Sequence, residues 1–207
     1  MITYHEPAEY SSLFPHFLEL ITQETDIKTV FDLGCNLGAF VKLVNSKIKT
    51  IQEIIAFEPD IDNFNYIKNA NYESLTIYNV GIFYGATECT VNGIGDNNIG
   101  GYMVGTIEDD HTDIWRSRIV EYPGKKFSLQ KLEDFTVGRE LDLIKIDVEA
   151  SEYNIIDNST SLKEFKWIIV EFHNHDLPFY SKYVDEKLSS THKTITHTDT
   201  HFLLKKI

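Results

Sequence analysis

Cysteine, long apolar runs and basic residues are all scarce in this sequence. The two cysteines, Cys35 and Cys89, are too few for a disulfide framework or a cysteine-based metal site, so we expect reduced thiols in a cytoplasmic protein. No apolar run approaches the ~20 residues that a transmembrane helix needs. The first seven residues, MITYHEP, lack a basic start followed by an apolar stretch, and they therefore do not predict a secretory signal.

Basic residues are outnumbered by acidic ones, 19 against 32, and the formal net charge is -13. A surface with this excess repels the phosphates of nucleic acids and the headgroups of anionic membranes. We therefore expect neither nucleic acid nor a membrane as a partner. A neutral or cationic small molecule fits the charge better.

The composition is otherwise that of an ordinary globular protein. The chain has 207 residues, of which 42% are apolar and 25% charged, and this excludes a disordered or collagen-like chain. The length suits one domain with a sizeable core, so we expect a single domain over residues 1–207.

Apolar periodicity predicts strands and helices that alternate. Residues 1–27 are expected to form an N-terminal helical segment, because their apolar side chains share one helix face. Five β-rich runs follow, at residues 29–33, 54–57, 75–80, 141–148 and 167–172. Strands that are apolar on both faces and alternate with helices predict an α/β fold with a parallel sheet covered on both sides. Residues 193–207 are expected to add an antiparallel hairpin at one edge.

The alternation breaks between residues 82 and 128. Seven of the 11 glycines lie between positions 81 and 105, and only residues 87–92 alternate weakly, as a hairpin strand would. A long irregular segment in a compact domain is commonly a functional loop. Two interpretations of this insertion stay open: a substrate lid, in which residues 93–120 close over a bound molecule, and a plain surface loop.

A glycine-containing turn after the first predicted strand is the first candidate site. Residues 32–38 read DLGCNLG. Glycine lets the backbone approach a ligand closely, and the helix that follows offers free N–H groups to a carboxylate or phosphate. The dinucleotide fingerprint needs glycine at position 36 and the P-loop ends in Gly-Lys-Ser/Thr, so neither matches.

Glu58 ends the second predicted strand, roughly 20 residues after this turn, where Rossmann-like sites place the acid that binds a ribose hydroxyl pair. A carboxylate can accept one hydrogen bond from each of two adjacent hydroxyls. The turn and Glu58 together indicate a nucleoside cofactor without a diphosphate. S-adenosylmethionine fits, because its amino-acid carboxylate can lie near the helix N-terminus.

Four sequence blocks occur in a recognisable order and spacing: VFDLGCNLGAF at residues 30–40, AFEP at 56–59, LIKIDVEASE at 143–152 and VEFH at 170–173. Together they resemble the FkbM family of S-adenosylmethionine-dependent methyltransferases. The third block is the most specific. One departure is visible, since the family usually has glycine where this chain has Ala150.

This resemblance implies a Rossmann-like class I methyltransferase fold, with a mostly parallel seven-stranded sheet, an antiparallel C-terminal hairpin and helices on both faces. It implies S-adenosylmethionine as the cofactor. The expected cofactor-binding residues are Asp32, Gly34, Asn36 and Gly38 for the methionine part, Glu58 for the ribose, and Asn79, Val80 and Gly81 for the adenine. Cys35 lies in the same cofactor loop, where we expect a small packing residue rather than a nucleophile.

Lys145, Asp147 and Glu149 are spaced by two along the fourth predicted strand. If the strand continues, all three side chains point to one side. Buried charges need partners, which favours a structural ion pair of Lys145 with Asp147 or Glu149. Ligands of open α/β sheets bind at the carboxyl ends of strands, which favours a catalytic role for the two carboxylates.

Glu171 and His173 end the next strand and complete the predicted catalytic group. Methyl transfer to a hydroxyl needs an aligned acceptor and benefits from a base. Asp147 or His173 is the candidate base, and Glu149 and Glu171 would position the acceptor. These four side chains could also supply ligands to a divalent metal, but no short metal motif supports this and we expect none. The remaining histidines near the C-terminus are expected on a solvated hairpin face: His192, His197 and His201.

The leading hypothesis is therefore O-methylation of a small-molecule or sugar hydroxyl. The alternative is a non-catalytic module that keeps the fold and the cofactor pocket. A nucleotide-dependent oxidoreductase is a third interpretation, against which Asn36 argues because it replaces the second fingerprint glycine.

Overall fold

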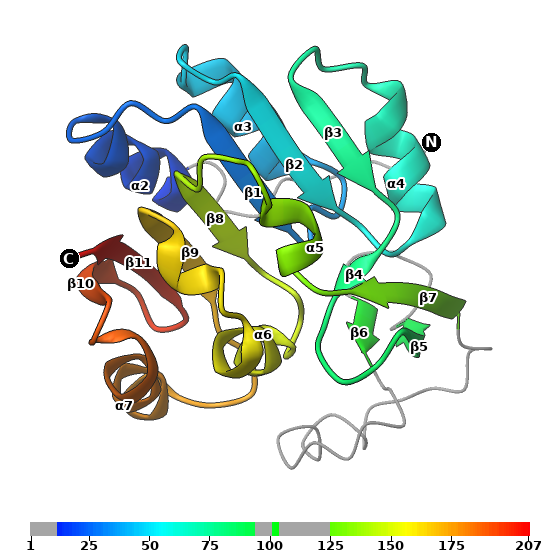
Figure 1. Ribbon diagram of the computed structural model, residues 1–207. Coiled ribbons are helices and arrows are strands. Elements are labelled where there is room, and N and C mark those ends of the chain that lie inside the picture. Colours follow the sequence, from blue (N-terminus) through cyan, green and yellow to red (C-terminus); the bar gives the residue numbers. More distant parts are fainter. Residues whose placement is uncertain (1–11, 94–100, 104–124) are drawn as a thin grey trace.

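The computed structural model of the protein describes residues 12–93, 101–103 and 125–207 (Figure 1). Its centre is a seven-stranded sheet in the order β10-β11-β9-β8-β1-β2-β3. The strands are β1 (Thr29–Leu33), β2 (Glu53–Phe57), β3 (Leu75–Tyr78), β8 (Leu143–Ile146), β9 (Trp167–Glu171), β10 (His192–His197) and β11 (His201–Lys206). Five neighbouring strands of this sheet, β9, β8, β1, β2 and β3, pair in parallel. Strand β11 pairs antiparallel with both β9 and β10. The predicted α/β fold with a C-terminal antiparallel hairpin is confirmed.

Helices cover both faces of this sheet (Figure 1). The helices are α2 (Leu13–Thr22), α3 (Ala39–Lys47), α4 (Ile61–Asn69), α5 (Glu133–Thr136), α6 (Glu152–Asn158) and α7 (Leu177–Leu188), with a short 3₁₀ turn at Leu162–Glu164. Apolar side chains of α2, α3 and α4 form one core with the sheet, and those of α5, α6 and α7 form another on the opposite face. This arrangement buries both faces of the parallel strands, as their continuous apolar pattern predicts.

Two aspartates determine where helices begin. Asp60 accepts hydrogen bonds from the N–H groups of Asp62 and Asn63 and caps α4. Asp176 accepts one from Phe179 and caps α7, with proline in the first turn. Both caps satisfy N–H groups that the helix itself leaves unpaired.

The register of β1 between its neighbours places the functional side chains. Asp32 lies beside Lys145 of β8 and Ala56 of β2. All five residues of β1 are buried. The carboxyl ends of β1, β2 and β8 therefore lie together, which is where an open α/β sheet binds its ligand.

A second sheet has the order β4-β7-β5-β6 and lies beyond the carboxyl ends of the parallel strands (Figure 1). Its strands are β4 (Gly81–Ile82), β5 (Glu88–Gly93), β6 (Gly101–Met103) and β7 (Lys125–Gln130). The described parts of the predicted insertion at 82–128 thus include strands β5 and β6 and the start of β7, with residues 83–87 irregular. The substrate lid predicted over 93–120 lies largely outside the described residues.

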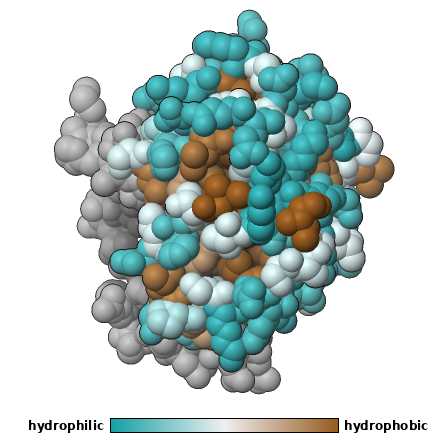
Figure 2. Space-filling model, turned by 90° about the vertical axis from the view of Figure 1, so that its left-hand side faces the viewer, coloured by the Kyte–Doolittle hydropathy of each residue, from teal (hydrophilic) through white to brown (hydrophobic). Residues whose placement is uncertain are grey.

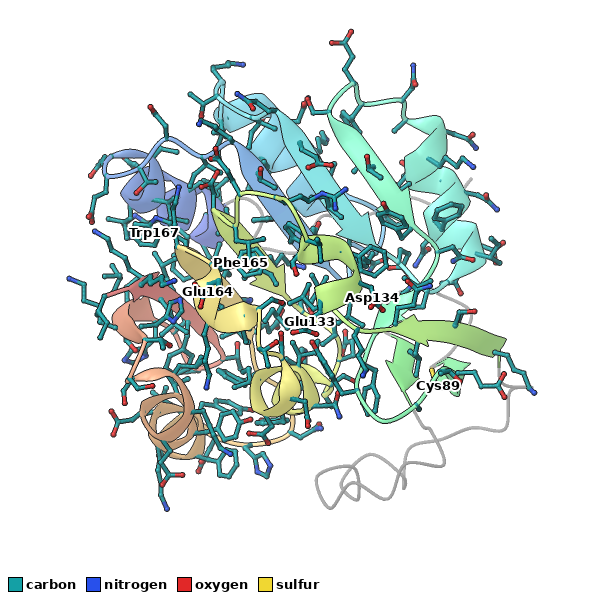
Figure 3. All side chains as sticks on the ribbon, viewed as in Figure 1. Cys89, Glu133, Asp134, Glu164, Phe165 and Trp167 are labelled. Carbon is teal, nitrogen blue, oxygen red and sulfur yellow. The ribbon has the colours of Figure 1, made fainter. Side chains whose placement is uncertain are left out.

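Glu133 of α5 connects this region to the turn after α6 (Figure 3). Its carboxylate accepts hydrogen bonds from the hydroxyl of Ser159, from the N–H groups of Thr160 and Ser161, and from the hydroxyl of Tyr84. These bonds hold the pKa of Glu133 at about 2, although partial burial acts to raise it. Glu133 therefore stabilises the packing of α5 and the second sheet against the main sheet.

One face of the molecule is shown in Figure 2. On it, apolar residues gather in small groups near the middle among hydrophilic ones. Some apolar surface of this kind is normal for a globular protein. Within the ranges that the structure describes, no helix is both long and apolar enough to cross a bilayer.

Candidate active site

Gly34 brings the cofactor turn into contact with the end of β8. Its backbone has φ +77°, and its N–H donates to the carbonyl of Phe57 at 3.1 Å. A Cβ atom at this position would lie 1.9 Å from the carbonyl oxygen of Asp147. Only glycine fits here, because both the left-handed backbone and the close approach exclude a side chain.

Glu58 organises the same turn from the end of β2. One carboxylate oxygen accepts from the N–H of Asn36 and the other from the N–H of Asp60, both at 2.8 Å. Burial raises the pKa of Glu58 to about 8, although these two hydrogen bonds lower it. Each carboxylate oxygen has a second lone pair, so the pair of oxygens can still accept from a diol.

The segment after β3, which carries the residues predicted for the adenine, lies against Glu58. The side-chain amide of Asn79 donates to the carbonyls of Glu58 and Pro59, each at 2.9 Å. Val80 is buried, and a Cβ added to Gly81 would lie 2.9 Å from the Leu129 side chain and 3.9 Å from that of Pro59. The structure thus brings the residues predicted for the ribose and the adenine to one place.

Cys35 and Gly38 complete the turn in different ways. Cys35 is buried in the core beneath α3, as expected of a packing residue, and burial raises the pKa of its thiol well above the ordinary value. The N–H of Gly38 donates to the carbonyl of Cys35 at 2.7 Å, and Gly38 has φ +77° at the start of α3. Contacts of Cys35 with a ligand would therefore come from its backbone.

Asp32, Lys145 and Asp147 form a buried row of charges. The Lys145 ammonium lies 3.3 Å from Asp32 and 3.1 Å from Asp147, and both Asp32 and Lys145 are almost completely buried. Burial raises the pKa of Asp32 more than Lys145 lowers it, and among the described residues its Oδ2 has no hydrogen-bond partner. The structural ion pair of Lys145 with Asp147 is present, and two carboxylates share one ammonium.

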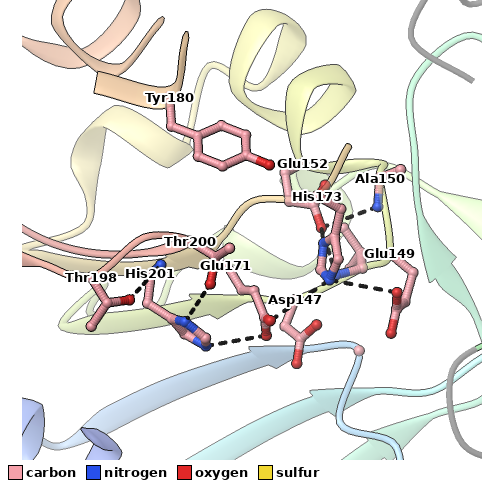
Figure 4. Close-up of polar contacts among 12 residues, drawn as sticks. Asp147, Glu149, Ala150, Glu152, Glu171, His173, Tyr180, Thr198, Thr200 and His201 are labelled. Atoms are coloured by element: carbon pink, nitrogen blue, oxygen red, sulfur yellow. Dashed lines mark hydrogen bonds and ion pairs between the residues drawn. The ribbon is translucent and has the colours of Figure 1, made fainter. Parts of the chain in front are cut away.

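The fourth strand ends earlier than the predicted residue 148. β8 stops at Ile146, and Glu149 and Ala150 have φ values of +51° and +79°. The chain therefore turns directly after Asp147, and the expectation that a continuing strand aligns Lys145, Asp147 and Glu149 is wrong. Glu149 lies instead against His173 (Figure 4).

His173 lies among carboxylates from three segments (Figure 4). Its Nδ1 is 2.8 Å from Glu152, and its Nε2 is 3.5 Å from Glu149 and 3.8 Å from Glu171. Burial lowers the pKa of His173, but the hydrogen bond and charge of Glu152 and the charges of Glu149 and Asp147 outweigh burial and raise the pKa to about 10. The ring is therefore a cation at neutral pH.

Glu149 has an unusual protonation equilibrium of its own. Burial raises its pKa to about 7, and repulsion from Asp147, Glu152 and Glu171 adds to this, while the charge of His173 opposes it. A carboxylate with this pKa accepts and releases a proton near neutral pH.

The sequence did not predict that His201 contacts Glu171 or that Glu152 contacts His173. His201 of β11 lies 3.2 Å from Glu171 and is buried, as is His192, so the predicted solvated face is wrong for both; His197 is exposed. Although burial acts to raise the pKa of Glu171, His201 and His173 hold it below its usual range. The continuous apolar run that follows His201, FLL, is the signal that could have indicated a buried strand there.

The acidic group also contains the donor atoms that a divalent cation would need. One ligand atom each from Asp147, Glu149 and His173 lies within 4.8 Å of the others. The protonated ring of His173 is a donor to carboxylates in this arrangement, whereas metal binding requires a neutral imidazole.

A known protein family matches most of this sequence. The sequence profile described as Methyltransferase FkbM domain matches residues 32–199. Among curated proteins, none matches the sequence.

Several solved structures have a similar fold. A methyltransferase FkbM from Methylobacillus flagellatus KT has 17% identity and a TM-score of 0.55, covering 86% of this chain and 44% of that one. An rRNA methylase from Escherichia coli has 12% identity and a TM-score of 0.50, covering 97% and 64%. The N-terminal domain of human METTL16 in complex with SAH has 12% identity and a TM-score of 0.51, covering 98% and 71%. This chain thus spans less than half the length of the first of these proteins.

Proposed function

This chain belongs to the FkbM methyltransferase domain family, and from this premise we propose that it transfers the methyl group of S-adenosylmethionine to a hydroxyl oxygen of a small molecule or sugar. The observation that supports this most strongly is spatial. The turn at Gly34, which would hold the cofactor, touches the backbone of Asp147, which carries the first catalytic carboxylate. Cofactor and acceptor groups therefore meet at the carboxyl ends of β1 and β8.

The chemistry of the turn fits this cofactor. Glu58 keeps free lone pairs for two ribose hydroxyls, and Asn79 and Val80 lie beside it for the adenine. The Asp32–Lys145–Asp147 row sets two carboxyl groups against one ammonium, which suits a cofactor that carries an ammonium and a sulfonium group. The N-terminal end of α3 faces the cofactor carboxylate in this proposal.

We assign the proton transfer to a carboxylate rather than to His173. When bound, the cofactor supplies a methyl group on a positive sulfur, and in-line attack by the hydroxyl oxygen forms a carbon–oxygen bond, breaks the carbon–sulfur bond and releases one proton. Glu149 takes that proton, since its pKa of about 7 suits a base at neutral pH. His173 already carries a proton and stabilises the charged carboxylates, and Asp147 and Glu171 orient the acceptor.

The carboxylates of the candidate catalytic residues favour some classes of acceptor over others. The carboxylates of Asp147, Glu149 and Glu171 are all partly exposed, and they would repel a phosphate backbone. Some proteins with a similar fold are RNA methyltransferases, but the likeness extends to the fold alone. We propose a neutral or cationic small acceptor, and we propose a cytoplasmic location because both cysteines are free thiols.

Replacement of Glu58 tests the cofactor assignment. At pH 9, above the pKa of about 8 at which Glu58 ionises, we expect Glu58→Ala to weaken S-adenosylmethionine binding by about 1.5–3 kcal/mol, or roughly 10- to 150-fold in Kd, since it removes hydrogen bonds to a charged group. Isothermal titration calorimetry with S-adenosylmethionine and its demethylated product measures this. Glu53→Ala is the matched control, because Glu53 lies at the other end of β2 and, within the described ranges, its carboxylate bonds to Arg139 alone. Unchanged binding by Glu58→Ala would remove the ribose assignment.

The pH dependence of transfer tests the base. We expect kcat/KM to rise about tenfold per pH unit below pH ~7, because Glu149 must be ionised to accept the proton, and to fall above pH ~10, where His173 loses its charge. Glu149→Gln should reduce kcat at least ~100-fold and abolish the rise of kcat/KM with pH below pH ~7. If that rise remained in this variant, the base would be another residue.

A panel of sugars, small hydroxyl compounds, amines and RNA identifies the acceptor class. Cofactor binding without transfer to any of these would favour the alternative of a non-catalytic module. Transfer to RNA would contradict the small-molecule proposal.

A further inference from the structure

Glu152 is a completely buried carboxylate that the proposed reaction does not use. It is the first residue of α6, and its side chain has no exposed surface. Its Oε1 accepts from the N–H groups of Val148 and Ala150, each at 3.2 Å, and lies 2.8 Å from Nδ1 of His173. One oxygen atom thus contacts both segments that carry the candidate catalytic side chains.

The turn that Glu152 holds is strained. Glu149 and Ala150 are consecutive non-glycine residues with left-handed backbones. This conformation is unfavourable for any residue with a Cβ atom. The turn therefore persists only because surrounding contacts compensate, and the two N–H groups bound by Glu152 are contacts of that kind.

The ring of His173 is oriented by the same carboxylate. With Nδ1 on Glu152, Nε2 is directed toward Glu149 and Glu171 (Figure 4). The hydroxyl of Tyr153 donates to the carbonyl of His173 at 2.8 Å, which ties the backbone of this residue to α6 as well. Ring and turn are thereby placed relative to each other by α6.

We propose that Glu152 is a positioning residue, whose buried carboxylate places the Glu149 side chain and the His173 ring against each other. This inference rests on the proposed methyl transfer. Loss of Glu152 would leave cofactor binding intact, because no contact of Glu152 reaches the turn at 34–38 or Glu58 among those described. It would misalign the base and the cation beside it, and so would lower the rate of transfer.

The charges facing His173 support this arrangement. They are Glu152 from α6, Asp147 and Glu149 from the turn after β8, and Glu171 from β9. The hydrogen bond and the charge of Glu152 are the largest of the effects that raise the pKa of His173. Removing the charge of Glu152 while keeping its shape should therefore lower the pKa of His173 more than any other single change.

The central experiment compares the wild-type protein with Glu152→Gln. We expect kcat to fall about tenfold or more while Kd for S-adenosylmethionine changes less than about threefold, because a bond to a charged group is lost away from the cofactor. The imidazole ¹⁵N signals of His173, assigned by their absence in His173→Gln, should titrate at least ~1 pH unit lower than in the wild type. An unchanged His173 titration together with unchanged kcat would overturn the proposal.

Ala150→Gly separates two consequences of Glu152→Gln, which are the loss of turn stability and the loss of His173 ring orientation. Glycine adopts φ +79° without strain, so Ala150→Gly and Glu152→Gln combined should recover stability of the turn. The rate and the His173 titration should remain at their Glu152→Gln values. Recovery of both by the double variant would show that Glu152 acts only on the turn and would contradict its role in orienting the ring.

One measurement requires no variant of Glu152 and covers the case in which Glu152→Gln does not fold. In the wild-type protein, the ¹⁵N signals of His173 should show a proton on Nδ1 at pH 8, because Nδ1 lies 2.8 Å from the Glu152 carboxylate. A ring whose Nδ1 carries no proton at that pH overturns the proposal. Because this readout needs no acceptor, it also stands if methyl transfer itself is not observed, whereas failure of cofactor binding in the wild type would refute the proposed function alone.

Discussion

Gly34→Ala should abolish cofactor binding and destabilise the protein more than any other single methyl group added to a described glycine. The new Cβ would lie 1.9 Å from the carbonyl oxygen of Asp147 and 2.9 Å from its carbonyl carbon. Both are backbone atoms at the end of β8, so no side-chain rotation relieves the overlap. β1 and β8 would have to separate at the point where the cofactor turn meets Asp147.

Two costs add at this position. The left-handed backbone costs an alanine roughly 1–2 kcal/mol, and overpacking typically costs about 1–3 kcal/mol more. We therefore expect a loss of about 2–5 kcal/mol in the free energy of unfolding, measured by urea denaturation. Calorimetry should detect no cofactor binding by the folded fraction.

Two other glycines provide matched controls. Gly138 has φ +76°, and no atom of the described residues lies within 4 Å of an added Cβ, so Gly138→Ala measures the backbone cost alone. Gly38 has the same φ as Gly34, but the nearest atom to its added Cβ belongs to the side chain of Ile67, at 3.2 Å. If Gly34→Ala were no less stable than Gly138→Ala and still bound the cofactor, the contact between the turn and Asp147 would not be essential.

The adjacency of the candidate cofactor residues could be predicted because neighbouring strands join the turn at 34–38 to Glu58. Leu33 pairs with Phe57 in register, so the turn after β1 and Glu58 after β2 must lie side by side. The parallel pattern and the position of Glu58 are both visible in the sequence. Hydrogen bonds from Asn36 and Asp60 to Glu58 then follow from that adjacency.

The catalytic half could be predicted only in part. The residues at the ends of β8 and β9 were found, since strand ends can be located by their apolar runs. Their mutual arrangement could not be derived, because it depends on the turn after Asp147 and on Glu152, whose buried carboxylate receives two N–H groups of that turn. His201 comes from the last strand, and only the sheet order places it beside Glu171.

Lys145→Met should cause the largest loss of stability among charge-removing substitutions at the site. Lys145 is the buried cation between Asp32 and Asp147, and methionine has a similar length without the charge. Removing one partner of a buried ion pair typically costs about 3–5 kcal/mol, because the other charge stays buried without compensation. Urea denaturation at neutral pH should show a loss of this size.

The pH dependence of that loss identifies Asp32 as its source. Burial already raises the pKa of Asp32 above 3.8, so the folded state binds this proton more readily than the unfolded state does. A raised carboxyl pKa makes stability fall as the pH rises from the unfolded value through the folded one. Without Lys145 the folded pKa rises further, and the deficit of Lys145→Met should be small near pH 4 and grow toward neutrality.

The double variant Asp32→Asn with Lys145→Met tests whether the loss comes from the unpaired charge of Asp32. It removes both buried charges, and replacing a whole buried pair costs far less than breaking it. We expect it to recover most of the stability that Lys145→Met loses at neutral pH, and to lose the pH dependence as well. If the double variant were as unstable as Lys145→Met at every pH, the cost would come from packing around Lys145, such as its contact with the ring of Phe40, rather than from the unpaired charge of Asp32.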